Sequence, residues 1–296
     1  DISFASTIDG GTYNLTLNAG SGGSITSSGG ISNMNTLTLT NSNGATFSTS
    51  NAITTVAIND TTDSADVTFT TLTATTLTTA NQGYDMNFYG GVSITNNVTF
   101  SNTGTLLIGN SSGLTNNFYA GVLATTPSSI TIQGMINANS GNITMGDVTT
   151  ALGLNHSGAS FGGSTTGNIT LGAVTGNVNG KLIIGSSGGT NTISVASING
   201  RNRTVTINGS TSTVSGTITN TTTLDINNNT TLNGAVSATT IDVSGTSNLG
   251  ANVTTSGTQT YTGAATLSGG DRTLTGSTMN FGNTLTGTAS HDLTIT

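Results

Sequence analysis

Acidic side chains, which could hold a metal ion or move a proton, gather most densely between positions 60 and 66. Asp60, Asp63 and Asp66 lie three positions apart in this polar stretch. Carboxylate oxygens suit a hard cation such as Ca²⁺, but this spacing matches neither the EF-hand loop nor the glycine-rich nonapeptide that binds Ca²⁺. We therefore interpret the segment as a solvated turn, with weak cation binding as the alternative, and we expect no cofactor.

Aromatic side chains are concentrated around two copies of Asn-Phe-Tyr that start thirty positions apart. Because neighbouring residues of an extended strand face opposite ways, we expect Phe88 and Phe118 to be buried. Their neighbours Tyr89 and Tyr119 should then face outward and, with nearby Tyr84, are the candidate binding residues. Exposed, stacked tyrosines can bind sugars or another protein chain. The alternative is that they only cover an irregular part of the fold.

The other residues suited to acid–base chemistry are isolated from one another. Asp225 and Asp242 occupy the polar centres of two short apolar segments. We expect another rung between them, which would leave both carboxylates as solvated surface charges. His156 and His291 are 135 positions apart and belong to no nucleophile motif, so we expect turn residues rather than catalysts. With no catalytic constellation in view, we predict that the protein is not an enzyme.

Charged residues are scarce: 4 Lys+Arg and 11 Asp+Glu make 5% of 296 residues, against about 25% in a typical soluble domain. Lys181, Arg201 and Arg203 could form a small positive spot, although charge balance in a chain of net charge −7 explains them equally well. So few basic residues cannot neutralise a nucleic-acid backbone. The absence of Cys excludes a disulfide scaffold and a zinc module. No apolar run approaches the roughly 20 residues of a membrane span.

These residues must be positioned by short strands, because apolar-polar-apolar triplets such as Leu15-Thr16-Leu17 recur along the whole chain. Alternation at period two places the aliphatic pair on one face of a strand and the central polar residue on the other. Gly, Asn or Ser clusters end each triplet. The aliphatic residues that we expect to stack in the core include Leu37, Leu39, Ile130, Ile132, Ile169, Leu171, Val205, Ile207, Leu293 and Ile295.

Many short, evenly spaced strands form either an antiparallel sandwich or a parallel β-solenoid. We favour the solenoid, because hairpin pairs such as Asn-Gly are not placed regularly between the triplets. Runs of Asn suit ladders of side-chain amides between stacked coils. With about 20 to 25 residues per coil, we predict an all-β, right-handed parallel β-helix of about 13 coils with little or no helix. It would be one domain over 1–296, with an irregular stretch at 81–128.

The end of the chain carries a recognisable repeat. Thr258–Leu267, followed by Thr273–Ser277 and Phe281-Gly282, resembles the repeat of large secreted bacterial proteins, the filamentous-haemagglutinin-like exoproteins and autotransporter passengers. The resemblance is sharpest over about the last forty residues and the first twenty. It implies a right-handed β-helix, export across an outer membrane, and a role in attachment or matrix building. It marks a scaffold rather than an activity.

The two ends of the sequence match each other. Ile2–Gly10 and Met279–Gly287 share the pattern apolar-x-Phe-x-x-Thr-Ile/Leu-x-Gly. Solenoid ends normally need caps, and neither end shows one. We expect either a segment of a longer solenoid or subunits that stack head to tail, since such a contact does not close and gives a filament.

We therefore predict a non-enzymatic, secreted structural or adhesive β-helix at the cell surface. It would form an extracellular rod or filament. Its partners would be other copies of the chain and surface glycans, and not nucleic acid. We expect no membrane span. The alternative is a polysaccharide-binding or polysaccharide-cleaving β-helix of the tailspike or lyase type. A third function, ice binding, is suggested by Thr-x-Thr strings such as Thr36–Thr40, but their changing spacing along the sequence counts against it.

Overall fold

The computed structural model describes residues 1–111, 113–150, 158–176, 179–288 and 290–296. It is an all-β, right-handed parallel β-solenoid of about 14 turns, and its described residues contain no helix. The predicted fold class is confirmed. Contacts within the chain define two compact units, unit 1 at Asp1–Asp147 and unit 2 at Val148–Thr296. That the chain is one continuous domain stays a prediction.

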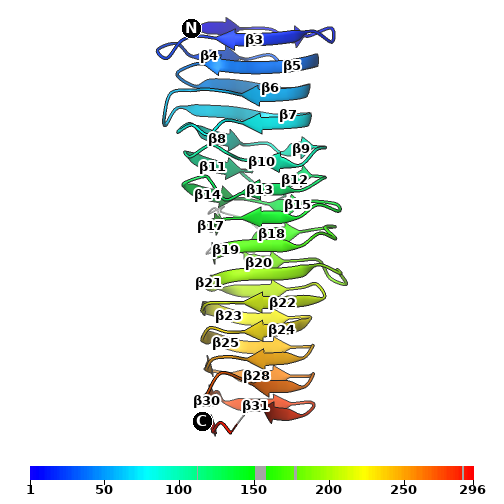
Figure 1. Cartoon of the computed structure of the whole chain (residues 1–296), viewed down its shortest axis with the longest axis vertical. Coiled ribbons are helices and arrows are strands. Elements are labelled where there is room, and N and C mark those ends of the chain that lie inside the picture. The colour runs from blue at the N-terminus through cyan, green and yellow to red at the C-terminus, as the bar shows by residue number, and fades with distance from the viewer. Residues whose placement is uncertain (112, 151–157, 177–178, 289) are drawn as a thin grey trace. The chain divides into compact units, whose positions relative to one another are not determined.

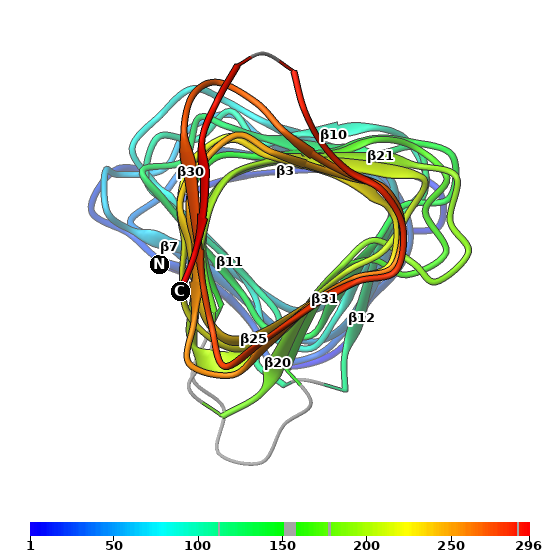
Figure 2. The same cartoon turned by 90° about the horizontal axis from the view of Figure 1, so that it is seen from below.

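Each coil turns through three flat faces separated by corners, as the triangular path of the ribbon shows (Figure 2). The faces follow from the sequence, because a triplet is long enough for one short strand and the next Gly, Asn or Ser cluster bends the chain. Successive coils pair strand by strand, and the strands of each unit lie edge to edge (Figure 1).

Unit 1 has faces A, B and C. Face A comprises β1 (Ile2–Phe4), β4 (Ile25–Ser27), β8 (Asp85–Phe88), β11 (Thr105–Ile108) and β14 (Ser129–Ile132). Face B comprises β2 (Ile8–Asp9), β9 (Val92–Ile94), β12 (Thr115–Phe118) and β15 (Met135–Asn137). Face C comprises β3 (Asn14–Asn18), β10 (Val98–Thr99), β13 (Val122–Ala124) and β16 (Ile143–Met145). Longer strands bend around corners: β5 (Ile31–Asn41) covers faces B and C, and β6 (Ala45–Ile58) and β7 (Asp66–Thr79) cover all three.

Unit 2 has faces D, E and F. Face D comprises β17 (Val148–Thr150), β27 (Val253–Thr255), β30 (Arg272–Thr275) and β33 (Leu293–Ile295). Face E comprises β18 (Gly158–Gly162), β20 (Lys181–Ile184), β28 (Thr258–Tyr261) and β31 (Thr278–Phe281). Face F comprises β22 (Thr211–Val214), β24 (Asn229–Leu232), β26 (Ser247–Leu249), β29 (Ala265–Leu267) and β32 (Leu285–Gly287). Four strands bend around corners: β19 (Ile169–Thr175), β21 (Thr192–Ile207), β23 (Ile218–Ile226) and β25 (Val236–Val243).

Coil length varies although the register holds. On face E, Leu182 pairs with Val205, 23 residues on, whereas Leu224 pairs with Ile241, 17 residues on. The corners absorb the difference, so inward residues still stack on inward residues. Most predicted core residues lie in the core at 3% exposed or less: Leu37, Leu39, Ile130, Ile132, Ile169, Leu171, Val205 and Ile207.

Leu293 and Ile295 depart from the predicted core. Leu293 is half-buried, and Ile295 is 51% exposed. Their strand pairs on one side, where Leu293 faces Arg272 and Ile295 faces Leu274. Without a second neighbouring coil in the structure, the inward side of these residues is only partly covered.

Asparagine side chains bond from coil to coil, both beside corners and within a face. Asn35 Nδ2 donates to Asn14 Oδ1 at 2.7 Å, and Asn137 Nδ2 donates to Asn117 Oδ1 at 2.9 Å. Asn220 adopts a φ of 51°, a left-handed conformation that Asn tolerates better than most residues. The amide ladders expected from the Asn-rich turns are therefore present as pairs.

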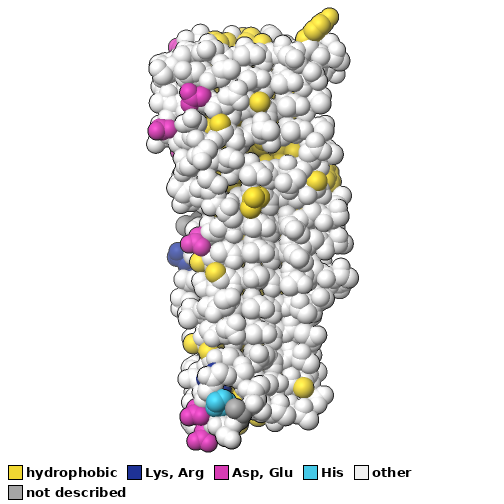
Figure 3. Space-filling view, in the orientation of Figure 1, with side chains coloured by type: hydrophobic (Ala, Val, Ile, Leu, Met, Phe, Trp, Pro, Cys, Tyr) yellow, Lys and Arg dark blue, Asp and Glu magenta, His cyan; other side chains and the backbone are white. Residues whose placement is uncertain are grey.

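The visible surface is mostly uncharged, with acidic and basic side chains in small scattered groups (Figure 3). Within the described parts of the chain, no helix has the length and apolarity needed to cross a membrane.

Candidate functional site

The orientation expected for the two Asn-Phe-Tyr segments is present in the structure. Phe88 and Phe118 are fully buried, whereas Tyr89 and Tyr119 are 37% and 36% exposed. The cause is the alternation of an extended strand, which turns neighbouring side chains to opposite sides.

The two segments do not stack on each other. Phe88 pairs with Ile108 on face A, whereas Phe118 pairs with Ile94 on face B. Thirty residues correspond here to one coil plus one face, so Tyr89 and Tyr119 follow different faces. Tyr89 and Tyr119 therefore do not stack, because the sequence interval does not equal a whole number of coils, and their role in binding stays a prediction.

Tyr84 is not a surface residue, which corrects its place among the binding candidates. Its side chain is fully buried, and its hydroxyl donates to the carbonyl oxygens of Ala80 at 3.3 Å and Ile58 at 3.4 Å. Burial raises the pKa of the Tyr84 hydroxyl above its usual range. A surface ligand cannot reach this ring, so its role is to fill the core.

The acidic stretch lies against the next coil, where two of its carboxylates meet backbone and amide donors. Asp63 Oδ1 accepts the backbone N–H of Gly83 at 3.0 Å, and Asp66 Oδ1 accepts Nδ2 of Asn87 at 2.8 Å. Asp60 lies half-buried in the preceding turn. Across the residues that the structure describes, no group of three or more His, Cys, Asp or Glu side chains could hold a metal ion. Two of these carboxylates instead bond to the next coil.

Asp225 and Asp242 are direct neighbours in adjacent rungs of face E, which corrects the expectation of a rung between them. The expectation failed because coil length cannot be read from the sequence. Asp242 is exposed and Asp225 half-buried, and Thr206 Oγ1 donates to Asp225 Oδ2 at 3.5 Å. A pair of neighbouring carboxylates is the chemistry that a polysaccharide-cleaving enzyme requires.

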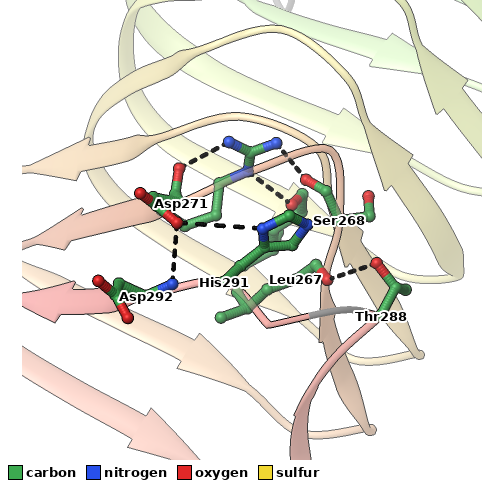
Figure 4. Close-up of polar contacts among 8 residues, drawn as sticks. Leu267, Ser268, Asp271, Thr288, His291 and Asp292 are labelled. Atoms are coloured by element: carbon green, nitrogen blue, oxygen red, sulfur yellow. Dashed lines mark hydrogen bonds and ion pairs between the residues drawn. The ribbon is translucent and has the colours of Figure 1, made fainter.

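A second polar cluster surrounds Asp271 (Figure 4). Asp271 Oδ1 lies 3.9 Å from His291 Nδ1 and accepts the backbone N–H of Asp292 at 2.9 Å. The guanidinium of Arg272 donates to the backbone oxygens of Asp271 and Ser268. These contacts join neighbouring coils and stabilise one corner, so the cluster has a structural role.

The remaining candidates are surface residues. Lys181, Arg201 and Arg203 are all exposed. Lys181 begins β20, Arg201 occupies a corner with φ of 52°, and Arg203 pairs with Thr221. Their grouping into a positive spot stays a prediction. His156 lies outside the described residues.

Neutral polar columns are an ordered feature of the surface. On face C, Asn14, Thr36, Thr55 and Thr76 follow one another in register. A second column two residues on consists of Thr16, Thr38, Ala57 and Thr78. The first column therefore repeats a hydroxyl or amide at the sheet spacing of about 4.8 Å, and the second does so except at Ala57.

Face F of unit 2 carries equivalent columns. The longer one consists of Thr170, Ser194, Thr213, Thr231, Asn248, Thr266 and Thr286. In the parallel column, Thr211 Oγ1 donates to Thr192 Oγ1 at 3.4 Å, and Thr246 Oγ1 donates to Asn229 Oδ1 at 3.0 Å. A shallow hollow of about 230 Å³ lies between the two columns. The sequence suggested the Thr-x-Thr strings but not their alignment.

Sequence reasoning missed one exposed aromatic residue. Tyr13 is 78% exposed, more than any other large apolar side chain among the described residues. It follows the turn Gly10-Gly11-Thr12. The signal available in the sequence was an aromatic residue directly after a glycine pair, in a chain with only 4% aromatic residues.

No protein-family model matches the chain, and no curated protein or solved structure matches it.

Proposed function

We propose that this chain is a non-enzymatic structural and adhesive β-solenoid of an extracellular, cell-surface protein. The observation that carries the proposal is the register of the neutral polar columns, which follow the core from coil to coil on faces C and F. A regular array of hydroxyls and amides offers many weak hydrogen bonds at once, and such contacts add up through multivalency. The partners would be hydrated polymers such as surface glycans, and other copies of the chain.

The scarcity of charge supports the same function. With 5% charged residues, adhesion would depend little on ionic strength, because there are few ion pairs for salt to screen. The similarity of Thr258–Leu267 to the repeats of filamentous-haemagglutinin-like exoproteins supports secretion and a surface location. Localisation is tested by fractionating the producing cell and digesting intact cells with protease, since an intracellular chain would be protected.

Adhesion is tested by measuring retention of the purified chain on polysaccharide-coated beads at low and high salt. We expect retention that changes little with salt. The double variant Thr211→Val and Thr213→Val removes two face F hydroxyls while keeping side-chain shape, and should weaken retention. The exposed Thr254→Val on face D is the matched control. Retention that disappears in salt would contradict the proposal, and depolymerisation of the beads would favour the enzyme alternative.

Ice binding is a second candidate, favoured by one observation. The Thr-x-Thr strings, unevenly spaced along the sequence, are aligned in space because the corners absorb differences in coil length. A two-column array made mostly of hydroxyls is a surface that could order water. Thermal hysteresis at micromolar protein would establish this function, and its absence would dismiss it.

A further inference from the structure

The backbone around Tyr13 is held rigidly on both sides. Tyr13 N donates to Gly10 O at 2.8 Å, which closes a tight turn. The next coil fixes the turn, because Thr12 N donates to Asn33 O at 2.6 Å and Asn35 N donates to Tyr13 O at 3.1 Å. Thr12 has a φ of 70°, which a β-branched residue rarely adopts. A strained, fixed turn thus presents an aromatic ring to solvent.

A hollow of about 520 Å³ lies beside this turn. Its walls come from three successive coils: Asp9 and Thr12 from the first, Asn33 and Asn35 from the second, and Thr54 from the third. The buried side chain of Met34 also lines it. Since residues of three coils form it, the hollow lies on the lateral surface of unit 1.

The Tyr13 ring stands at the rim of the hollow. Gly11 lines the hollow, and a Cβ built on Gly11 would lie 3.6 Å from Cδ2 of Tyr13. A planar apolar ring therefore adjoins a concave surface of mixed polar and apolar character. Tyrosine gives such contact area at low cost in side-chain entropy.

The carboxylate of Asp9 is positioned as a hydrogen-bond acceptor. Its Oδ1 accepts the backbone N–H of Gly11 and Nδ2 of Asn33, both at 3.1 Å. Among the described residues, Oδ2 has no hydrogen-bond partner. The N–H of Gly11, and secondly the amide of Asn33, lower the pKa of Asp9. The group is therefore an anion at neutral pH, with one oxygen available to accept from a ligand hydroxyl.

We propose that the hollow beside Tyr13 binds an uncharged sugar unit of a polysaccharide. The ring would cover the apolar face of the sugar, while Asp9, Asn35 and Thr54 bond its hydroxyls. No lining residue is basic and one is an anion, so acidic sugars and phosphates are disfavoured. The inference rests on the proposed adhesive function and names the ligand class of one site on that surface.

The chain offers a matched comparison in unit 2. Another hollow, of about 350 Å³, is lined by Asn220, Thr221, Ser237, Thr239 and Thr254, among others. None of its lining residues is aromatic or acidic. Binding that requires an aromatic ring and a carboxylate should therefore be lost by changes at Tyr13 and Asp9, and kept when Asn220 is changed.

The test is a titration of the full chain, monitored by calorimetry and NMR. The ligands are neutral glucan, mannan and galactan hexasaccharides and an acidic oligogalacturonate. We expect at least one neutral oligosaccharide to bind, with oligogalacturonate weaker. Tyr13→Ala should weaken binding at least about 10-fold, as loss of an aromatic anchor does. Tyr13→Phe should stay within about 3-fold, because the ring remains. Asp9→Asn should weaken binding of the neutral oligosaccharide. It should also reduce the ratio of the affinity for the neutral oligosaccharide to the affinity for the acidic one.

The control is Asn220→Ala, which should leave affinity unchanged. Because Tyr13 is exposed, circular dichroism should show Tyr13→Ala to be folded. Unchanged binding by folded Tyr13→Ala, a preference for the acidic oligosaccharide, or no binding to any neutral oligosaccharide overturns the inference. In each case bead retention through faces C and F would still support the proposed function. If Tyr13→Ala instead lowers the sedimentation coefficient, the ring is a contact between chains and the inference is wrong.

Discussion

The interiors of the two units are filled differently. In unit 1, Phe47, Phe69, Phe88, Phe100 and Phe118 form a run of rings with neighbouring centroids 4.8–6.1 Å apart. In unit 2, polar side chains occupy inward positions of face F. There, Ser212 Oγ bonds Asn228 Oδ1 at 2.9 Å and Thr230 Oγ1 at 2.8 Å, all buried.

This difference shows what a parallel coil demands of its core. The backbone ladder fixes strand positions in both units, so the inward side chains have to fill the space and leave few polar groups unbonded. Aromatic rings fill the space with their volume. Buried hydroxyls satisfy their polar groups by hydrogen bonding to the coil above or below. Gln259 and Tyr261 combine both solutions, since the buried Tyr261 hydroxyl donates to Gln259 Oε1 at 2.9 Å.

A charge buried without a partner should be the most damaging change in unit 2. Ile207 pairs with Ile184 and Ile226 and is fully buried. Ile207→Asp should lower the free energy of unfolding by more than about 4 kcal/mol, because the carboxylate has no partner there. Urea unfolding measures the loss, with exposed Thr254→Asp as control. A loss below about 1 kcal/mol, the size of an ordinary substitution, would contradict the view of a close-packed interior.

Removing one ring should test the aromatic interior of unit 1. Phe88 contacts both Phe69 and Phe100, at centroid distances of 6.1 and 6.0 Å. Phe88→Ala should cost about 3–5 kcal/mol, because it leaves a cavity in the middle of the run. Hydrogen exchange of unit 1 amides would locate the effect. Tyr89→Ala is the matched control and should stay within about 0.5 kcal/mol.

The hydroxyl chain of unit 2 should be less sensitive. Ser212→Ala removes the partner of Asn228 Oδ1 and Thr230 Oγ1 and should cost about 1–3 kcal/mol. Exposed Ser210→Ala is the control. If Ser212→Ala lowers the free energy of unfolding as much as Phe88→Ala does, the proposed difference between an aromatic interior and a hydrogen-bonded polar interior is wrong.

Buried tyrosines should make both units sensitive to alkali. Burial raises the pKa of Tyr84 in unit 1 and of Tyr261 in unit 2. A pKa that is raised in the folded state means that folding favours the protonated tyrosine. The contribution of this tyrosine to stability is therefore complete below the pKa of the unfolded chain, about 10, and is lost as the pH rises above that value. Phenolate absorbance should show Tyr84 and Tyr261 ionising only above the usual tyrosine range. Tyr261→Phe should reduce the alkaline loss of stability, and ionisation of Tyr84 and Tyr261 within the usual range would contradict this.

The smallest effect concerns two stacked aspartate pairs. Asp66 and Asp85 pair in unit 1, where both accept hydrogen bonds, and Asp225 and Asp242 pair in unit 2. Asp242→Asn should stabilise by about 0.2–0.5 kcal/mol at low salt, because like charges directly opposite repel. The gain should shrink in high salt. Asp66→Asn, where the carboxylate accepts Asn87 Nδ2, should give no gain.

Much of the fold could be predicted from local sequence. Triplets such as Val205-Thr206-Ile207 set which side of a strand faces the core, because alternation depends only on neighbouring residues. The same rule placed Phe88 inward and Tyr89 outward. The parallel solenoid was predictable from a different local signal: the turns lack the residue pairs that hairpins need.

The candidate site was less predictable. Tyr84 directly precedes β8, outside the strand itself, and the structure buries it. Tyr89 and Tyr119 share a motif but follow different faces. The hollow beside Tyr13 draws residues from three coils, so no local pattern marks it.

Sequence alone determined the inward or outward direction of most strand residues and the neutral chemistry of the faces, because both depend on residue type and local period. Which residues of different coils become neighbours was decided by the tertiary structure. Coils differ in length, with register partners 17 residues apart in one pair and 23 in another. The corners absorb that difference, so the interval along the chain does not give the distance in space.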